Sequence, residues 1–226
     1  MAQKGKRFRA SLEGFDCDQV LPLREAIDKV KSFKPTKFEQ SVDLCMHLGI
    51  DAKQADQLVR GSLSLPHGIG KTRRVVAFCG PEHVAAAKEA GAVEAGSDDL
   101  IKKIQDGWME FDVAVATPDV MKKVSRLGRQ LGPRGLMPSP KAGTVTPQVA
   151  EAVKEYGAGK LEFRNDSGGN VHAVIGRVGF ETDKLAENAK AFIDTIERMK
   201  PSSSKGIYVK KISVAATMSP GVLVAV

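Results

Sequence analysis

The chain has 226 residues, of which 42% are hydrophobic and 27% charged, and its formal net charge is +7. This length suffices for one or two domains with a buried core, and the composition excludes wholesale disorder, collagen and low-complexity sequence. The three cysteines stand far apart and the four histidines show no metal-ligand spacing. We therefore expect no disulfide framework, no metal site and no cofactor.

The first part of the chain predicts a helix followed by half-buried strands. Residues 21–32 begin with Pro22 in the first turn and repeat apolar side chains at helical spacing. Between residues 42 and 48 apolar and polar side chains alternate, which is the period of a strand with one buried face. The run at 58–65 shows a similar alternation.

From residue 66 onward short apolar strands alternate with helices. The predicted strands are 74–79, 92–95 and 112–117. The predicted helices are 81–90, one capped by Ser97, one beginning at Pro118, and 146–156 after a Gly/Pro-rich loop at 131–144. This alternation predicts a mostly parallel sheet covered by helices on both faces.

After residues 157–159 the two-residue period returns. Residues 161–164 and 171–176 alternate on either side of the turn-forming segment 165–170, which predicts a hairpin. A helix at 182–199 and a last strand at 207–218 complete the chain.

The two ends of the chain therefore share one pattern and the middle has another. The economical fold class is α/β (α+β plus α/β), with two domains. Residues 1–66 and 159–226 form an α+β domain, and residues 67–158 form an inserted, Rossmann-like, three-layer α/β domain. Two or three consecutive domains are the alternative, although the last would have only about 67 residues, which is marginal for independent folding.

Neither end of the chain predicts a targeting or membrane segment. Residues 1–9 are basic but lack the apolar stretch of a secretory signal. The largely apolar run at 212–226 contains Pro220 and Gly221 and is too short to span a bilayer. We therefore expect a cytoplasmic protein without a membrane partner.

Basic residues gather in two segments that contain no acid. Residues 1–9 carry four basic side chains, and residues 120–150 carry six. Two such runs in a basic chain favour a polyanionic partner, most often nucleic acid, although a solvated basic surface is the alternative interpretation for either run.

The chain shows no arrangement of residues typical of an enzyme. The segment 68–72, GIGKT, resembles part of a phosphate-binding loop, but Leu65 stands where the first glycine of such a loop is required. The segment also precedes a predicted strand, whereas a phosphate loop leads into a helix. A nucleotide-dependent enzyme that uses the inserted sheet remains the alternative function.

The segment 131–145, LGPRGLMPSPKAGTV, resembles the signature of the L-one family of bacterial large-ribosomal-subunit proteins. Further family motifs follow one another in the family's order over essentially the whole chain. They are 37–42 (KFEQSV), 59–61 (VRG), 65–68 (LPHG), 111–119 (FDVAVATPD), 163–166 (FRND), 171–172 (VH) and 213–218 (SVAATM). One position departs from the family pattern: Ser219 stands before Pro220 where the family usually has glycine.

The resemblance implies a fold and a function. The fold is two α/β-type domains, one formed by both termini and one inserted. The protein would be a non-enzymatic constituent of the large ribosomal subunit that binds large-subunit ribosomal RNA at the mobile stalk. It would assist the release of exit-site tRNA and repress translation of its own operon mRNA, so these two RNAs are further expected partners.

The family's RNA contacts, carried over residue by residue, fall on the domain formed by both termini. They are Lys37, Phe38, Glu39, Arg164, Asp166, Ser167, His172, Thr217 and Met218. Because most of these residues adjoin the ends of predicted strands, we expect three strand ends to converge on one rim. Basic side chains there would bind phosphates, hydroxyls would bind 2′-hydroxyl groups, and Phe38 and Met218 would supply apolar surface.

Phe38 of this set and the neighbouring Ser219 carry alternatives. The sequence pattern alone favours core packing for Phe38, whereas the resemblance favours an RNA contact. At the neighbouring position 219, a serine in place of glycine would either push the strand end away from RNA or add a hydroxyl contact.

Overall fold

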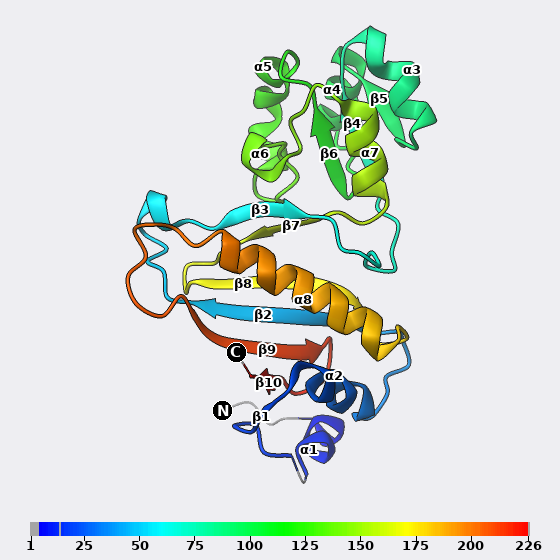
Figure 1. The fold of residues 1–226 in the computed structure, drawn as a ribbon. Helices are drawn as coiled ribbons and strands as arrows, with labels where there is room; N and C mark the ends of the chain where they lie inside the picture. The colour runs from blue at the N-terminus through cyan, green and yellow to red at the C-terminus, as the bar shows by residue number, and fades with distance from the viewer. Residues whose placement is uncertain (1–4, 14, 226) are drawn as a thin grey trace. The chain divides into compact units, whose positions relative to one another are not determined.

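The computed structural model describes residues 5–13 and 15–225. The chain folds into two compact units. Unit 1 consists of Met1–Gly70 and Phe163–Val226, and unit 2 of Lys71–Glu162. Two segments that are far apart in the sequence therefore form unit 1, as the blue and the orange-to-red elements of Figure 1 show.

Unit 1 is built on a five-stranded sheet with strand order β1-β10-β9-β2-β8. The strands are β1 (Val20–Leu21), β2 (Ser41–Leu48), β8 (Asn170–Arg177), β9 (Val209–Ala216) and β10 (Val222–Val224). Only β1 and β10 pair in parallel. The helices α2 (Leu23–Ser32) and α8 (Thr182–Arg198) pack on one face of the sheet (Figure 1). The shorter elements of unit 1 are α1 (Lys6–Leu12) and η1 (Ala55–Gln57).

The alternation predicted for β2 is present in the structure. Val42, Leu44, Met46 and Leu48 are buried under the helices, and the residues that alternate with them are only partly buried. In α8, Leu185, Ala189, Phe192 and Ile196 are completely buried, as the helical spacing predicts. The sheet therefore has one covered face and one open face.

The predicted hairpin is wrong. The strand β7 (Leu161–Arg164) pairs with β3 (Arg60–Leu63) in a separate two-stranded sheet, while β8 pairs with β2. Of the hairpin only one isolated bridge remains, between Asn165 and Val171. β2 and β8 are both eight residues long and bury their apolar side chains on the same face, so they pair over nearly their whole length.

The chain also contains a strand that the sequence did not predict. β9 ends at Ala216, and the chain turns back into β10, which pairs antiparallel with β9. The apolar run near the C-terminus is therefore two strands of one sheet.

Unit 2 is a three-layer structure around a parallel three-stranded sheet with order β5-β4-β6. Its strands are β4 (Val75–Phe78), β5 (Glu94–Gly96) and β6 (Val113–Ala116). Its helices are α3 (Pro81–Glu89), α4 (Asp98–Gln105), α5 (Met121–Val124), η2 (Ser125–Leu127), α6 (Gly128–Leu131), η3 (Pro140–Ala142) and α7 (Val149–Gly157). β4 and β6 are buried along their whole length, and one apolar cluster lies on each face of the sheet. The prediction of a parallel sheet covered on both faces is confirmed.

Two helices of unit 2 begin three residues later than predicted. After Pro118 the chain first makes a turn, and α5 begins at Met121. Before α7, the hydroxyl of Thr146 accepts a hydrogen bond from the Gln148 N–H over 3.2 Å, which stabilises a turn. Ser97 stands directly before α4 as predicted, but its side chain makes no capping hydrogen bond.

Candidate nucleic-acid interface

One end of the large sheet brings together five of the predicted contacts. We call them the first cluster: Lys37, Phe38, Glu39, Thr217 and Met218. They lie where β2 begins and β9 ends, because Val42 is in register with Ala216. The Thr217 N–H donates to the Ser41 carbonyl, and the Ser41 N–H donates to Thr217 Oγ1, both over 3.1 Å. These bonds join chain segments that are 176 residues apart.

The side chains of Phe38 and Met218 are exposed to solvent, while hydrogen bonds fix the backbone at both residues. Their exposed fractions are 52% and 51%. The Met218 N–H donates to Oε1 of the buried Gln40 over 3.0 Å, and the Phe38 carbonyl accepts from the hydroxyl of Thr36. The interpretation of Phe38 as a core residue is therefore wrong, and the two side chains offer a flat apolar surface beside polar groups.

Two arginines that the sequence analysis missed lie at the same end of the sheet. Arg7 donates from Nη2 to the Met218 carbonyl over 3.1 Å. Arg177 donates from Nη1 to the Glu39 carbonyl and to Ser41 Oγ, both over 3.3 Å. A guanidinium has five N–H donors, more than these bonds use, so both side chains can also bind phosphate. The acid-free N-terminal run pointed to Arg7, whereas only the pairing of β8 with β2 brings Arg177 to this place.

The other four predicted residues form a second cluster around the turn before β8. They are Arg164, Asp166, Ser167 and His172. Asp166 holds this turn: Oδ1 accepts from the N–H groups of Gly168 and Asn170 over 2.8 and 2.7 Å, and Oδ2 accepts from Asn170 Nδ2 over 3.0 Å. These bonds, foremost those of Asn170, lower the pKa of the Asp166 carboxyl. Asp166 therefore stabilises the turn, and it leaves Arg164 and Ser167 on the surface as the polar groups for a ligand.

The two clusters do not converge on one rim. β2 and β8 are antiparallel, with Ser41 in register with Arg177 and His47 with Asn170. The first cluster lies at the Ser41 end of β2, and the second cluster lies at the His47 end. Six residues of strand separate the two ends, which is about 20 Å at roughly 3.3 Å per residue. The expectation of a single rim assumed a hairpin between β7 and β8, and the pairing of β8 with β2 overturns it.

His172, the member of the second cluster on β8, lies on the open face of the sheet, with its Nε2 3.8 Å from Asp166 Oδ2. It is in register with Cys45, which is in turn in register with Ser213 on β9. Burial raises the pKa of the Asp43 carboxyl, and the nearby His172 opposes that rise. Burial also raises the pKa of the Cys45 thiol, so the thiol stays protonated and neutral. A row of small polar groups thus connects the first cluster with the second.

Ser219, the one departure from the family pattern, shapes the turn after β9. Its Oγ accepts from the Ala216 N–H over 2.8 Å and donates to the Pro220 carbonyl over 3.0 Å. The hydroxyl is thus bonded within its own turn, which keeps Met218 at the strand end.

The turn at Asp166 leads to a prediction on pH dependence. The pKa of Asp166 is lowered in the folded protein, so its ionised form adds stability above the unfolded value near 3.8, and this stability is lost as the pH falls below it. Replacing Asp166 with asparagine should lower the melting temperature at pH 7 and change it less at pH 3. Thermal melts of wild type and variant at both pH values measure this. Replacement of the exposed Asp56 with asparagine is the control, and an equal Asp166→Asn deficit at both pH values contradicts the assignment.

The candidate phosphate loop has no helix behind it. Gly68 and Gly70 adopt φ values of 61° and 71°, and the chain continues into β4. A Cβ at position 70 would approach the Phe180 ring to 2.9 Å, so close packing as well as backbone conformation requires glycine there. Residues 68–70 form a tight turn at the end of the first segment of unit 1, and the interpretation of this motif as a nucleotide site is excluded.

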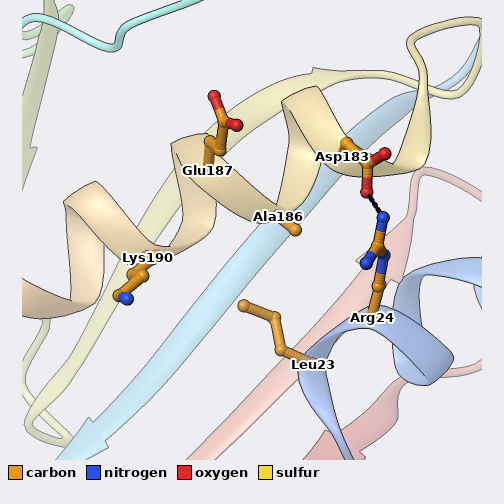
Figure 2. A pocket seen from close by; sticks show the side chains of 6 residues that line it. All are labelled: Leu23, Arg24, Asp183, Ala186, Glu187 and Lys190. Atoms are coloured by element: carbon orange, nitrogen blue, oxygen red, sulfur yellow. Dashed lines mark hydrogen bonds and ion pairs between the residues drawn. The ribbon is translucent and has the colours of Figure 1, made fainter.

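A groove on the helix-covered side of unit 1 shows no catalytic arrangement. Figure 2 shows it between α2 and α8. Its lining residues are Leu23, Arg24, Asp183, Ala186, Glu187 and Lys190. Arg24 and Asp183 form an ion pair, and the lining holds no histidine, cysteine or hydroxyl group.

Within residues 5–13 and 15–225, no group of three or more His, Cys, Asp or Glu could hold a metal ion, and no helix is long and apolar enough to cross a membrane.

The chain matches a known protein family over most of its length. Residues 30–220 match the family described as the ribosomal protein L1p/L10e family. The protein named large ribosomal subunit protein uL1 from Nocardioides sp. is 51% identical over 222 residues, which cover 98% of this chain and 92% of the relative. The proteins of the same name from Cutibacterium acnes and Methylobacillus flagellatus are 53% and 52% identical over 220 and 224 residues, covering 97% and 99% of this chain and 95% and 97% of the relatives. With a family match over most of its length and relatives of about half identity from end to end, this chain belongs to the ribosomal protein L1p/L10e family.

Proposed function

We propose that this protein is a structural constituent of the large ribosomal subunit and that it binds large-subunit ribosomal RNA through unit 1. The interface consists of the first cluster, the open face around His172, and the second cluster. Its place of action is the ribosome in the cytoplasm. The family is one of structural ribosomal proteins, and the chain is not an enzyme.

The observation that carries this proposal is the pair of exposed apolar side chains, Phe38 and Met218, held beside arginines. Phe38 and Met218 are large enough to pack on a base or a ribose, and Arg7 and Arg177 lie against the backbone of the first cluster. Phosphates would bind the guanidinium groups while the apolar surface contacts unstacked parts of the RNA.

The open face suits the shallow groove of an RNA helix. In the same register row as His172 of the second cluster, it offers the Ser213 hydroxyl and the neutral Cys45 thiol. Such groups can exchange hydrogen bonds with 2′-hydroxyl groups, which distinguish RNA from DNA. The separation of the clusters means that the protein contacts RNA at two points along one face.

The finer parts of the function follow from the family resemblance. Unit 1 acts as the RNA-binding domain and unit 2 as the inserted domain. On the ribosome the protein assists release of exit-site tRNA at the mobile stalk, and off the ribosome it represses its own operon mRNA. If one surface of unit 1 binds both ribosomal and messenger RNA, the two RNAs should compete for the protein, which a gel-shift competition with both fragments measures.

Removal of either exposed apolar side chain should weaken specific RNA binding. Phe38→Ala and Met218→Ala should each cost about 1–3 kcal/mol of binding free energy, the magnitude of a lost base-stacking contact. Neither side chain is buried, so the melting temperature should change little. The measurement is titration of a large-subunit stalk RNA fragment at fixed salt.

The matched control is Val93→Ala, because Val93 is 50% exposed but belongs to unit 2. Full affinity of a folded Phe38→Ala protein would remove Phe38 from the interface. Thr217 is a poor test of contact, because its hydroxyl also bonds Ser41 and a substitution would disturb the sheet end itself.

A further inference from the structure

Unit 2 presents a helical segment whose exposed side carries mostly basic residues. α5, η2 and α6 follow one another without interruption from Met121 to Leu131. Val124, Leu127 and Leu131 are buried in the core of unit 2. Lys122, Arg126 and Arg129 stand at spacings of four and three on the opposite, exposed side. We call these three residues the basic face.

The charges of the basic face are not balanced by neighbours. Among the described residues, none of the three forms an ion pair, although Lys123 binds Asp98 over 2.8 Å. Asp98 lines a hollow together with Lys102, Lys123 and Arg126. The pKa of the Asp98 carboxyl is lowered, mainly by its hydrogen bond with Lys123 and further by the charges of Lys102 and Arg126. The positive potential therefore extends across the hollow. One acid faces more cations than it can neutralise.

The shape and composition of the segment suit a nucleic acid backbone. Seven residues of helix span about 10 Å, the axial length of roughly three successive phosphates on one strand. The segment 121–131 contains no aromatic residue, so it has nothing on which a base could stack. None of the large exposed hydrophobic residues of the described chain lies in it, which disfavours a lipid surface.

We propose that the basic face of unit 2 binds the phosphate backbone of RNA, as a second surface that is independent of nucleotide sequence. The proposal rests on the proposed function in so far as RNA is taken as the ligand of this chain. The guanidinium groups of Arg126 and Arg129 bind phosphate oxygens in bidentate fashion, and Lys122 adds a point charge one turn away.

Salt dependence of binding to an RNA without any ribosomal sequence tests the proposal. The probe is a 20-base-pair RNA duplex of arbitrary sequence, titrated with full-length protein between 50 and 300 mM KCl. Each neutralised phosphate contributes about 0.9 to the slope of log K against log salt, so the loss of two contacts in Arg126→Gln/Arg129→Gln should reduce the slope by about 1.8. At 100 mM KCl the affinity of the double variant for the duplex should fall at least fivefold.

The matched control is Lys88→Gln/Lys154→Gln, which removes two positive charges from exposed positions on α3 and α7 of the same unit. Its slope should stay within about half a unit of the wild-type slope. All variants are compared by thermal melting, because substitutions on an exposed helix face should leave the core intact. Equal slopes for the two double variants would overturn the proposal. A competition experiment gives a second outcome that would overturn it. If polyglutamate displaced the labelled duplex as effectively as unlabelled duplex does, the surface would bind acidic proteins rather than RNA.

The same experiment separates this proposal from the proposed function. The double variant Phe38→Ala/Met218→Ala should lose affinity for the stalk RNA fragment and keep the wild-type slope on the arbitrary duplex. A wild-type protein that binds the stalk fragment no better than the duplex contradicts the proposed function alone. A wild-type preference for the stalk fragment, with no effect of Arg126→Gln/Arg129→Gln on either RNA, contradicts the basic face alone.

Discussion

Phe192→Ala should destabilise unit 1 by about 3–5 kcal/mol, the usual cost of emptying a buried aromatic site. Phe192 lies on α8, is completely buried, and meets the ring of Phe163 edge to face with centroids 5.4 Å apart. Phe163 belongs to β7, so the pair fastens α8 to the small sheet of β3 and β7. The cavity left by the alanine removes this packing at the centre of the unit.

Urea denaturation followed by circular dichroism and by fluorescence measures this loss. The chain has one tryptophan, Trp108, which packs against the core of unit 2. Its fluorescence therefore reports on unit 2, whereas most of the long strands and the longest helix belong to unit 1. We expect the circular-dichroism transition to move to lower urea and the fluorescence transition to stay in place. Phe38→Ala, which removes an exposed ring, is the control, and a loss below about 1 kcal/mol for Phe192→Ala would contradict the assigned packing.

Asn188→Leu should cost about 2–4 kcal/mol, because it leaves backbone groups without partners inside the protein. Asn188 is completely buried on α8. Its Oδ1 accepts from the His67 N–H over 3.1 Å, and its Nδ2 donates to the carbonyls of Gly68 and Ile175 over 3.0 and 2.8 Å. One amide thus ties the turn at 66–70 to a helix and a strand, and no hydrocarbon side chain can replace it.

Two measurements test the role of Asn188. Chemical denaturation gives the stability, and limited trypsin digestion reports on the turn, since Lys71, Arg73 and Arg74 follow it directly. In the leucine variant these sites should be cut faster than in wild type. Asn188→Asp is the control. It keeps the oxygen that accepts from the His67 N–H and loses the two N–H donors to the Gly68 and Ile175 carbonyls. If these two donated bonds contribute most of the stability, the aspartate variant should be close in stability to the leucine variant. Cleavage at the wild-type rate in a destabilised Asn188→Leu protein would show that the amide does not hold the turn.

Much of the fold was predictable because the side chains that the local sequence pattern marks as inward-facing are the ones that the tertiary structure buries. The alternation in β2 and the helical spacing in α8 each mark the face that becomes buried. The short apolar strands of unit 2 are buried from both sides, as their unbroken hydrophobicity predicts. The family motifs identified the family, and the structure brings Phe38 and Met218 to the same end of the large sheet.

The prediction failed where strand pairing decided the outcome. The alternation in β8 specifies which face is buried but carries no information about the neighbouring strand, and β2 offers a longer partner than β7. For this reason the predicted single rim became two clusters at opposite ends of β2. The same pairing places Arg177 at the first cluster, a position that no local pattern marks.

The amino-acid sequence by itself determined the family of this protein and its mixed α/β class. It also determined which faces of the long elements are buried, and it marked the acid-free basic segment that contains the basic face. These features follow from periodicity and composition, which are properties of residues close together in the sequence. The tertiary structure alone decided which strands lie side by side, where Asn188 finds its three partners, and how far apart the candidate RNA contacts stand. These depend largely on pairings between residues more than one hundred positions apart, where the free energy of the whole core outweighs any local preference.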